Sequence, residues 1–160
     1  MGKENKTNAM RKLDSMKIAY EEHYYEGAIA GTDVAKELGE DPDSVFKTLV
    51  TVAKSGEHYV FLVPVCKELD LKKAASAVGE KSVSMLKSKD LLPLTGYIHG
   101  GCSPIGMKKL FRTTLHKTAE GMDTIFCSGG RIGFQIELSP DDLKKVIPFQ
   151  YADIVRESDE

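Results

Sequence analysis

The segment from Val45 to Val65, VFKTLVTVAKSGEHYVFLVPV, carries the strongest structural signal in the chain. Residues 45–53 and 58–65 are runs of β-branched and aromatic side chains, and the turn-forming residues KSGE separate them. Two such runs joined by a short turn that contains glycine predict a β-hairpin. Because apolar residues occupy both faces of each run, we expect both strands to be buried.

Helices and strands are intermixed on both sides of this hairpin. Apolar spacing and glycine stops predict helices over residues 7–16, 32–38, 70–78 and 139–146, with N-caps at Thr32, Asp70 and Ser139. A turn or short helix is expected at 41–42 and another short helix after Ser88. Extended segments are predicted at 18–25, 96–100, 112–116, 124–127, 133–138 and 152–155. The pattern favours an α/β (α+β) fold with a mixed, largely antiparallel sheet.

Length and composition limit the kind of protein. The 160 residues include 22 Lys or Arg and 24 Asp or Glu, which gives a formal net charge of −2, and 41% of them are hydrophobic. Such a chain is expected to form one globular domain over residues 1–160. Its apolar runs are too short to cross a bilayer, which argues against a membrane protein. Residues 1–10 are polar and the three cysteines cannot all pair, so a reduced cytoplasm is the expected location.

Several common catalytic motifs are missing from the sequence. It has neither a GxxxxGK[ST] phosphate loop nor a GxGxxG dinucleotide motif. Ser103 is not in a GxSxG context, and His99 with Cys102 provides only half of a zinc ligand set. Free cysteines of this kind are usually packing residues. We therefore expect no metal and no cofactor.

Lys47 is unusual because it interrupts an apolar strand. Alternation places it on one face with Val45, Leu49 and Thr51. An unpaired ammonium is costly to desolvate, so such a lysine either reaches water along its aliphatic stem or meets an anion. Both interpretations stay open here: a solvated lysine at a strand end, or a cationic anchor for a phosphate or a polarised carbonyl.

Two glycine-rich segments are the second candidate feature. They are residues 100–106, GGCSPIG, and residues 128–133, SGGRIG. Glycine lets backbone N–H groups approach an oxygen-rich ligand closely, as in anion-binding nests. A pair of tight turns would explain the same residues without a ligand.

Charge is distributed unevenly along the chain. Residues 81–117 hold seven basic residues and one acid, a local charge of +6, whereas the rest of the chain sums to −8. Such a stretch is either a solvated basic face or a surface that follows nucleic-acid phosphates. The near-neutral total argues against tight, indiscriminate binding of nucleic acid.

Several motifs together resemble one family. VFKTL (45–49), LDLKKA (69–74), TGY (95–97), GGCSPIG (100–106) and SGG (128–130) followed by IEL (136–138) have the order and approximate spacing of the YbaK/EbsC family of Cys-tRNA(Pro) deacylases. The resemblance extends from about Met16 to Val155. These proteins are similar to the editing domain inserted in bacterial prolyl-tRNA synthetases. The resemblance implies a mixed, barrel-like sheet surrounded by helices.

The resemblance also implies roles for individual residues. Lys47, Gly101 and Ser128 are implied to be catalytic, and Lys47 is implied to hold the 3′-terminal phosphate or the ester region of the substrate. The implied substrate-binding residues are Tyr25, Thr48, Ser103, Pro104, Gly129, Gly130 and Gln135. Gln135 departs from the family pattern, because several members have aspartate or a small polar residue there.

The implied activity is trans-editing, the removal of cysteine from mischarged Cys-tRNA(Pro), with Cys-tRNA(Cys) as a further substrate. No protein nucleophile is needed, since the cysteinyl thiol can attack its own ester while a cation and glycine-loop N–H groups stabilise the oxyanion. Two alternatives stay open: an Ala- or Ser-tRNA deacylase that activates water, and a non-catalytic module that binds charged tRNA or a synthetase. The expected partners are the acceptor end of aminoacyl-tRNA and prolyl-tRNA synthetase.

Overall fold

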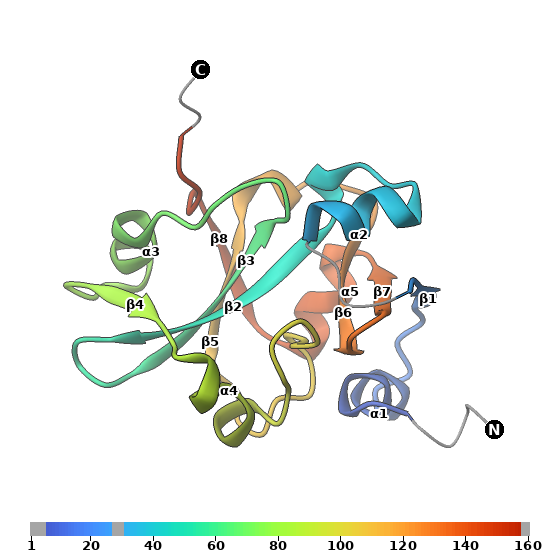
Figure 1. The fold of residues 1–160 in the computed structure, drawn as a ribbon, viewed down its shortest axis with the longest axis horizontal. Helices are drawn as coiled ribbons and strands as arrows, with labels where there is room; N and C mark the ends of the chain where they lie inside the picture. The colour runs from blue at the N-terminus through green and yellow to red at the C-terminus, as the bar shows by residue number, and fades with distance from the viewer. Residues whose placement is uncertain (1–5, 27–30, 158–160) are drawn as a thin grey trace.

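Figure 1 shows the fold in a computed structural model, which describes residues 6–26 and 31–157. The helices are α1 (Asn8–Ser15), α2 (Gly31–Leu38), α3 (Leu71–Val78), α4 (Ser88–Thr95) and α5 (Pro140–Val146), with short 3-10 turns η2 (Pro42–Ser44) and η3 (Lys117–Ala119). The strands are β1 (Glu21–Tyr24), β2 (Phe46–Ala53), β3 (His58–Pro64), β4 (Val83–Met85), β5 (Arg112–His116), β6 (Ile125–Arg131), β7 (Phe134–Leu138) and β8 (Phe149–Ala152). Among the described helices, none has the length and apolarity needed to cross a bilayer.

The larger sheet is built around the hairpin predicted from residues 45–65. Its strand order in the described chain is β4-β2-β3-β5-β8. β2 pairs antiparallel with β3 and, at its end, with β4, whereas the β3–β5 and β5–β8 pairs are parallel. β3 is almost wholly buried, as its apolar sequence predicts. The expected mixed α+β fold with a largely antiparallel share is confirmed.

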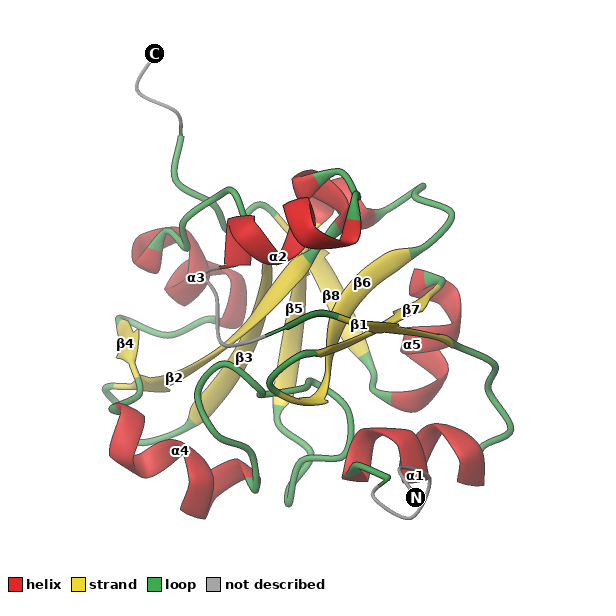
Figure 2. Cartoon of the chain, turned by 45° about the vertical axis from the view of Figure 1, so that its right-hand side comes forward, coloured by secondary structure: helices red, strands yellow, loops and turns green. Residues whose placement is uncertain are grey.

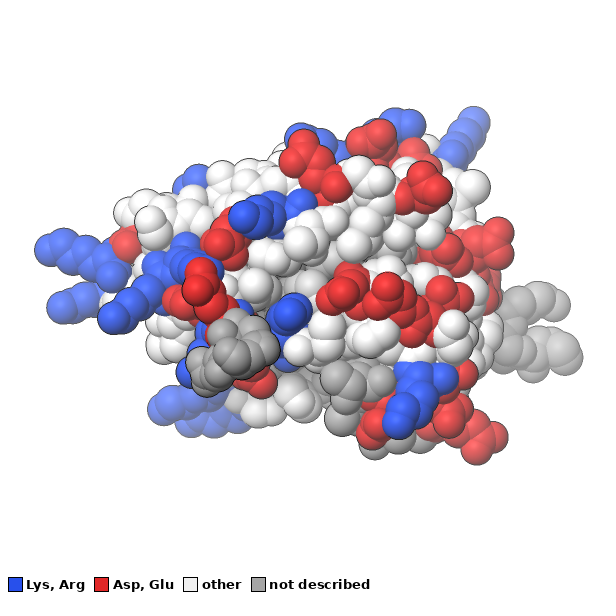
Figure 3. Space-filling view, turned by 90° about the horizontal axis from the view of Figure 1, so that it is seen from above, with Lys and Arg blue, Asp and Glu red and all other residues white. Residues whose placement is uncertain are grey.

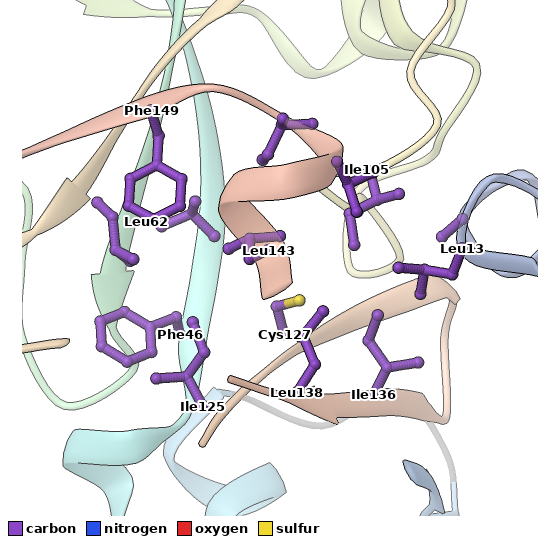
Figure 4. Packing of buried hydrophobic residues seen from close by; sticks show 14 of the residues in the cluster. Leu13, Phe46, Leu62, Ile105, Ile125, Cys127, Ile136, Leu138, Leu143 and Phe149 are labelled. Carbon is purple, nitrogen blue, oxygen red and sulfur yellow. The ribbon is translucent and has the colours of Figure 1, made fainter. Parts of the chain in front are cut away.

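A smaller antiparallel sheet with the order β1-β7-β6 packs against the larger one. The two sheets join at an isolated parallel bridge between Val45 and Phe126. Apolar side chains from both sheets and from α1 and α5 fill the core between them (Figure 4), among them Phe46, Leu62, Ile136 and Leu143. Figure 2 shows the helices around the outside of the two sheets, the arrangement that the family resemblance implies.

The helix ends follow the local chemistry of the sequence. Thr7, Asp70 and Ser139 accept hydrogen bonds from backbone N–H groups in the first turns of α1, α3 and α5. These caps satisfy donors that a helix leaves unpaired at its start. α3 ends at Gly79, whose φ of 75° is easily adopted by glycine. The predicted caps Asp70 and Ser139 and the stop at Gly79 are therefore confirmed.

Some predicted elements need correction. α2 begins at Gly31, so Thr32 lies inside the helix instead of capping it. Residues 96–100 form a turn and not a strand, because Gly96 ends α4 in a left-handed conformation and the apolar signal of Tyr97 reflects burial. β4 has little sequence signal because it has three residues, of which two are exposed. The last strand pairs with β5 over residues 149–152 and so lies earlier than predicted.

Candidate functional site

The main cavity lies where the two sheets separate. β2 and β6 run in the same direction and touch at the Val45–Phe126 bridge, after which β2 stays with β3 and β6 stays with β7. The two strands therefore diverge, and a cavity of about 580 Å³ occupies the gap. Lys47 and Ser128, each two residues beyond the bridge, line its two walls.

The cavity is apolar at its base and polar along its walls. Buried side chains form the base, including Phe46, Val50, Val65, Leu91 and Cys102. Met85, Ser88, His99 and Gly100 are exposed at the rim, and the polar wall residues are Tyr25, Lys47, Thr48, Ser128 and Gln135. A mostly apolar cleft with a few converging polar groups is typical of a site for a small ligand or group.

Lys47 supplies the positive charge on the wall of this cavity. Its side chain is half-buried, and in the described part of the chain no carboxylate forms an ion pair with it. A partly desolvated cation without a counter-charge gains stability when an anion or an oxyanion enters. This placement favours the anchor interpretation of Lys47 over that of a solvated lysine at a strand end.

At Thr48, the edge of β2 that faces the gap has no partner strand in the described part of the chain. The backbone N–H of Ala53 donates to Glu57 O across the β2–β3 pair. Because alternate residues of a strand direct their backbone groups to the same side, the other odd-numbered residues of β2 also face β3. The even-numbered residues therefore face the other edge, as the bond from Leu86 N to Val50 O shows. β4 covers only the far end of that edge, and no described strand reaches Thr48. The backbone N–H and C=O of Thr48 are thus directed toward the cavity.

Gln135 and Ser128 form the opposite wall from directly paired positions on β7 and β6, so their side chains project from one face of the small sheet. Both residues are buried. Tyr25 extends this wall through the bond from its N–H to Gly133 O. Gln135 Oε1 and, across the gap, Thr48 Oγ1 are buried without a hydrogen bond to any described residue. Buried polar atoms nearly always have partners, so two unsatisfied atoms in one cavity indicate a binding role.

The glycines of the two loops pack against each other behind the cavity. A Cβ at Gly101 would lie 2.9 Å from both Arg131 Cα and Ile132 N, which explains the need for glycine. The N–H of Gly101 is bonded to a carbonyl in its own turn, and the N–H of Gly130 is bonded to Ser128 Oγ. Both N–H groups therefore already have acceptors within the loops and are not free donors for an oxyanion.

Four residues expected to bind substrate lie outside the cavity lining: Ser103, Pro104, Gly129 and Gly130. Ser103 is wholly buried, and its hydroxyl accepts a hydrogen bond from Ile105 N. Pro104 faces a separate hollow of about 280 Å³. A Cβ at Gly129 would enter the ring of Phe134, and Gly130 has a φ of 107°. These residues shape the loops that carry Ser128 and Cys102.

Helix α1 supports both glycine loops from behind. The Thr7 hydroxyl donates to Gly129 O at 2.5 Å while accepting from Met10 N. A Cβ at Gly106 would lie 2.7 Å from the backbone carbon of Asn8, so the first loop also closes on the first turn of α1. The sequence shows Thr7 as a helix-start residue, but nothing local in it indicates the contact with Gly129.

No described side chain in the cavity is activated as a nucleophile. Burial raises the pKa of the Cys102 thiol to about 12, so this thiol stays protonated at neutral pH. Ser128 Oγ accepts from Gly130 N, and no described histidine forms a hydrogen bond with a serine or cysteine side chain. Within the described ranges, no three His, Cys, Asp or Glu side chains gather in a way that could hold a metal.

Comparison with known proteins places the chain in a family. The sequence profile described as the aminoacyl-tRNA editing domain matches residues 28–146. A protein of Enterococcus faecalis (strain ATCC 700802 / V583), whose name describes it as the Cys-tRNA(Pro)/Cys-tRNA(Cys) deacylase EbsC, is 45% identical over an alignment of 154 residues, and the match covers 94% of each chain. The chain belongs to the aminoacyl-tRNA editing domain family. The resemblance seen in the sequence is thus confirmed.

Two solved structures share the fold of this editing domain. One, described as a trans-editing enzyme for prolyl-tRNA synthetase, has a TM-score of 0.84 at 23% identity and covers 94% of this chain and 96% of its own. The other, hypothetical protein APE2540, has a TM-score of 0.85 at 19% identity and covers 93% of this chain and 99% of its own. At these identities the likeness concerns the fold, and it confirms the expected architecture.

The matched region of the editing domain omits elements that contribute to the site. α1, β1 and Tyr25 all precede residue 28, where the profile match begins. Nevertheless Tyr25 lines the cavity and Thr7 bonds to Gly129. The first part of the chain therefore contributes directly to this cavity and to the loop beside it.

The surface of the editing domain is electrostatically divided. In Figure 3 acidic side chains cover much of the right half of the face seen from above, and a group of basic side chains lies at its left end. All seven basic residues of 81–117 are exposed. Two of them, Lys87 and Lys89, flank Ser88 at the rim of the cavity. Positive charge therefore lies close to the entrance.

Proposed function

We propose that this protein is a trans-editing deacylase that releases cysteine from Cys-tRNA(Pro), with Cys-tRNA(Cys) as a further substrate. The observation that carries the proposal is the cavity between β2 and β6, whose described lining residues offer a cation and uncharged polar groups but no activated nucleophile. The name of the Enterococcus faecalis relative supports the same substrates.

The acceptor end of the tRNA enters at the basic rim. Lys87 and Lys89 attract the phosphates near the entrance, and Lys47 binds the terminal phosphate or the ester oxygens inside. The aminoacyl group then lies between the Thr48 wall and the wall formed by Ser128 and Gln135. Gly101 acts indirectly, by allowing the two loops to approach each other.

The reaction uses the thiol of the substrate. The cysteinyl sulfur attacks its own ester carbonyl carbon, and the new C–S bond closes a thiolactone. The C–O bond to the 3′-terminal ribose breaks, and the thiol proton passes to the departing ribose oxygen. Water then hydrolyses the thiolactone to free cysteine. The Lys47 ammonium and the Thr48 N–H supply positive charge and a donor for the oxyanion, and one such donor is typically worth about 100-fold or more in rate.

This chemistry explains how the site separates similar amino acids. A difference of one methylene group in a pocket gives only about 1–3 kcal/mol of discrimination. Size alone therefore separates cysteine poorly from alanine or serine. A reaction that needs a thiol excludes both, because their esters lack the nucleophile.

We also propose that residues 1–160 act as one editing domain in the cytoplasm and that prolyl-tRNA synthetase is a partner. The net charge of −2 supports the need for a partner, since affinity for a tRNA body depends on many phosphate contacts. A synthetase that binds tRNA(Pro) would supply the selectivity for the tRNA body.

The test is a deacylation assay with separately charged tRNAs. The protein is incubated with Cys-tRNA(Pro), Ala-tRNA(Pro), Ser-tRNA and Cys-tRNA(Pro) whose thiol has been alkylated. We expect release of the amino acid from unmodified Cys-tRNA(Pro) only. Release of alanine, serine or alkylated cysteine at a similar rate would instead indicate an activated water. Binding of charged tRNA without release would identify a non-catalytic module.

A further inference from the structure

Among the described residues that line the cavity, none provides a negative counter-charge to an amino group. Its described lining residues include Lys47 but neither Asp nor Glu. An aminoacyl ester carries an α-amino group, which in its protonated form would be a second cation beside Lys47. Burying that ammonium here is unfavourable, because the two like charges repel and no carboxylate compensates for lost hydration.

The cavity does offer uncharged acceptors. Gln135 Oε1 and Thr48 Oγ1 lie on opposite walls, and neither has a hydrogen-bond partner among the described residues. Gln135 is only 7% exposed, so an unmet hydrogen bond there is costly. A neutral amine has two N–H donors for two such acceptors and a lone pair that can accept from an ammonium. Its hydrogen-bonding pattern therefore matches Gln135, Thr48 and Lys47.

We propose that this site selects the aminoacyl ester with its α-amino group uncharged, and that Gln135 and Thr48 are the specificity-determining acceptors for that group. The inference rests on the proposed function, since it concerns the same substrate in the same cavity. It predicts that substrate affinity depends on the protonation state of the substrate more than on that of the protein.

Other titratable groups near Gln135 have to be separated from this effect. On the strands these groups are His23 on β1, Glu137 on β7, Lys47 on β2 and Arg131 at the end of β6. Tyr25 follows β1 directly, and the 98–102 loop carries His99 and Cys102. Glu137 does not line the cavity, and its carboxylate accepts from His23 Nε2 at 2.9 Å and from the Thr124 hydroxyl at 2.5 Å. The control ester described next separates any contribution of these protein groups from that of the substrate.

The experiment compares two esters of tRNA(Pro) between pH 6 and pH 8. For Cys-tRNA(Pro) we expect KM to fall about tenfold or more over this range, because α-amino groups titrate near pH 7.7–8.0 in peptides. The control is the 3-mercaptopropionyl ester, which keeps the thiol and lacks the amino group, and its KM should stay constant. Removing the amino group also raises the pKa of the thiol, so KM and not kcat is compared between the two esters. A fall in KM that persists with the control ester would assign the titration to the protein and overturn the inference.

Two variants test the acceptor directly. Gln135→Glu introduces a carboxylate that can pair with an ammonium, so KM for Cys-tRNA(Pro) should become nearly independent of pH. Gln135→Met keeps the length and removes the acceptor, so KM should rise several-fold for the cysteinyl ester and not for the control ester. For each variant, KM is compared between two pH values and between two esters. A general loss of stability would change KM for both esters, so it can be distinguished from loss of the acceptor. Unchanged pH dependence in Gln135→Glu would contradict the role of Gln135.

The outcomes separate this inference from the function on which it rests. If neither ester is cleaved by the wild-type protein, the deacylase proposal is wrong. If both are cleaved and KM for Cys-tRNA(Pro) does not change with pH, only the selection of the neutral amine is wrong.

Discussion

The two sheets of this protein are held in place by different kinds of contact. In the larger sheet, β2 and β3 pair over seven consecutive positions and are joined by a short turn. In the smaller sheet, a bulge between Ser128 and Arg131 interrupts the β6–β7 ladder, and the loop is held by α1 and by the 98–106 segment. The Lys47 wall is therefore stabilised locally and the Ser128 wall by distant segments. Substitutions in the first wall should affect chemistry alone, whereas substitutions behind the second should affect stability and activity together.

The largest effect is expected for Lys47→Met, on the locally stabilised wall. The variant keeps the aliphatic stem and removes the charge, so kcat/KM for Cys-tRNA(Pro) should fall about 100-fold or more, the usual loss for one donor that stabilises an oxyanion. The melting temperature should stay the same or rise, because the described residues hold no ion pair to lose. Deacylation kinetics and thermal unfolding measure the two quantities.

The control for this variant is Lys54→Met, which changes an exposed lysine in the turn of the same hairpin. Its activity and stability should match those of the wild type. Similar losses of activity in both variants would show that Lys47 acts through general charge and has no specific role in the cavity.

The second prediction concerns the contact between the two loops. In Gly101→Ala the new methyl group meets the backbone of Arg131 and Ile132, so the loops must separate. Overpacking of this kind lowers the free energy of unfolding by about 1–3 kcal/mol. Activity should fall as well, because Ser128 and Cys102 shift. Chemical denaturation and deacylation rates provide the measurement.

Gly121→Ala is the matched control, since Gly121 has a φ of 92° and open space around a Cβ. Its free energy of unfolding should fall by about 1 kcal/mol, because alanine disfavours a positive φ, and its activity should be unchanged. Full activity in Gly101→Ala would contradict the idea that loop packing sets the cavity.

The third prediction tests the support from α1. Thr7→Val removes the hydroxyl that bonds to Gly129 O and caps the helix, so stability should fall by about 1 kcal/mol. The kcat should fall several-fold while KM changes little, and Thr7→Ser should restore it. Asp70→Ala removes the corresponding cap of α3, away from the cavity, and should lower stability equally without changing kcat. Equal kcat values in Thr7→Val and Asp70→Ala would mean that α1 contributes stability only.

The smallest effect is expected at His116, at the end of β5 in the larger sheet. Burial lowers the pKa of His116 below its ordinary value of 6.5, and Nδ1 accepts a hydrogen bond from Ile154 N. The unfolded chain therefore takes up a proton at this histidine at a higher pH than the folded protein does. The contribution of His116 to stability is thus complete above about pH 6.5 and is lost as the pH falls toward the lower pKa that His116 has in the folded protein. The melting temperature should drop less between pH 7 and pH 5 in His116→Asn, whose amide oxygen can still accept from Ile154 N. A steeper drop in the variant would contradict this account.

Much of the larger sheet could be predicted from the sequence, and less of the smaller one. The β2–β3 hairpin, β5 and the cap at Asp70 depend on residues that are neighbours along the chain, so periodicity and capping rules apply to them. Lys47 could be singled out because a charge in an apolar strand is a local anomaly. The glycine loops were expected to offer N–H groups to a ligand, because glycine patterns do not distinguish close packing of two loops from ligand binding.

The sequence by itself determined the hairpin and the position of the cation, because local patterns of apolar and polar residues record which side chains must be buried. The family was indicated by the resemblance of its motifs. Only the tertiary structure decided that β2 and β6 diverge after the Val45–Phe126 bridge and that Thr48 and Gln135 lie on opposite walls of one cavity. It also decided that Thr7 bonds to Gly129, 122 positions further along the chain. Contacts of this kind depend on how separate elements pack, and no periodicity along the chain records that packing.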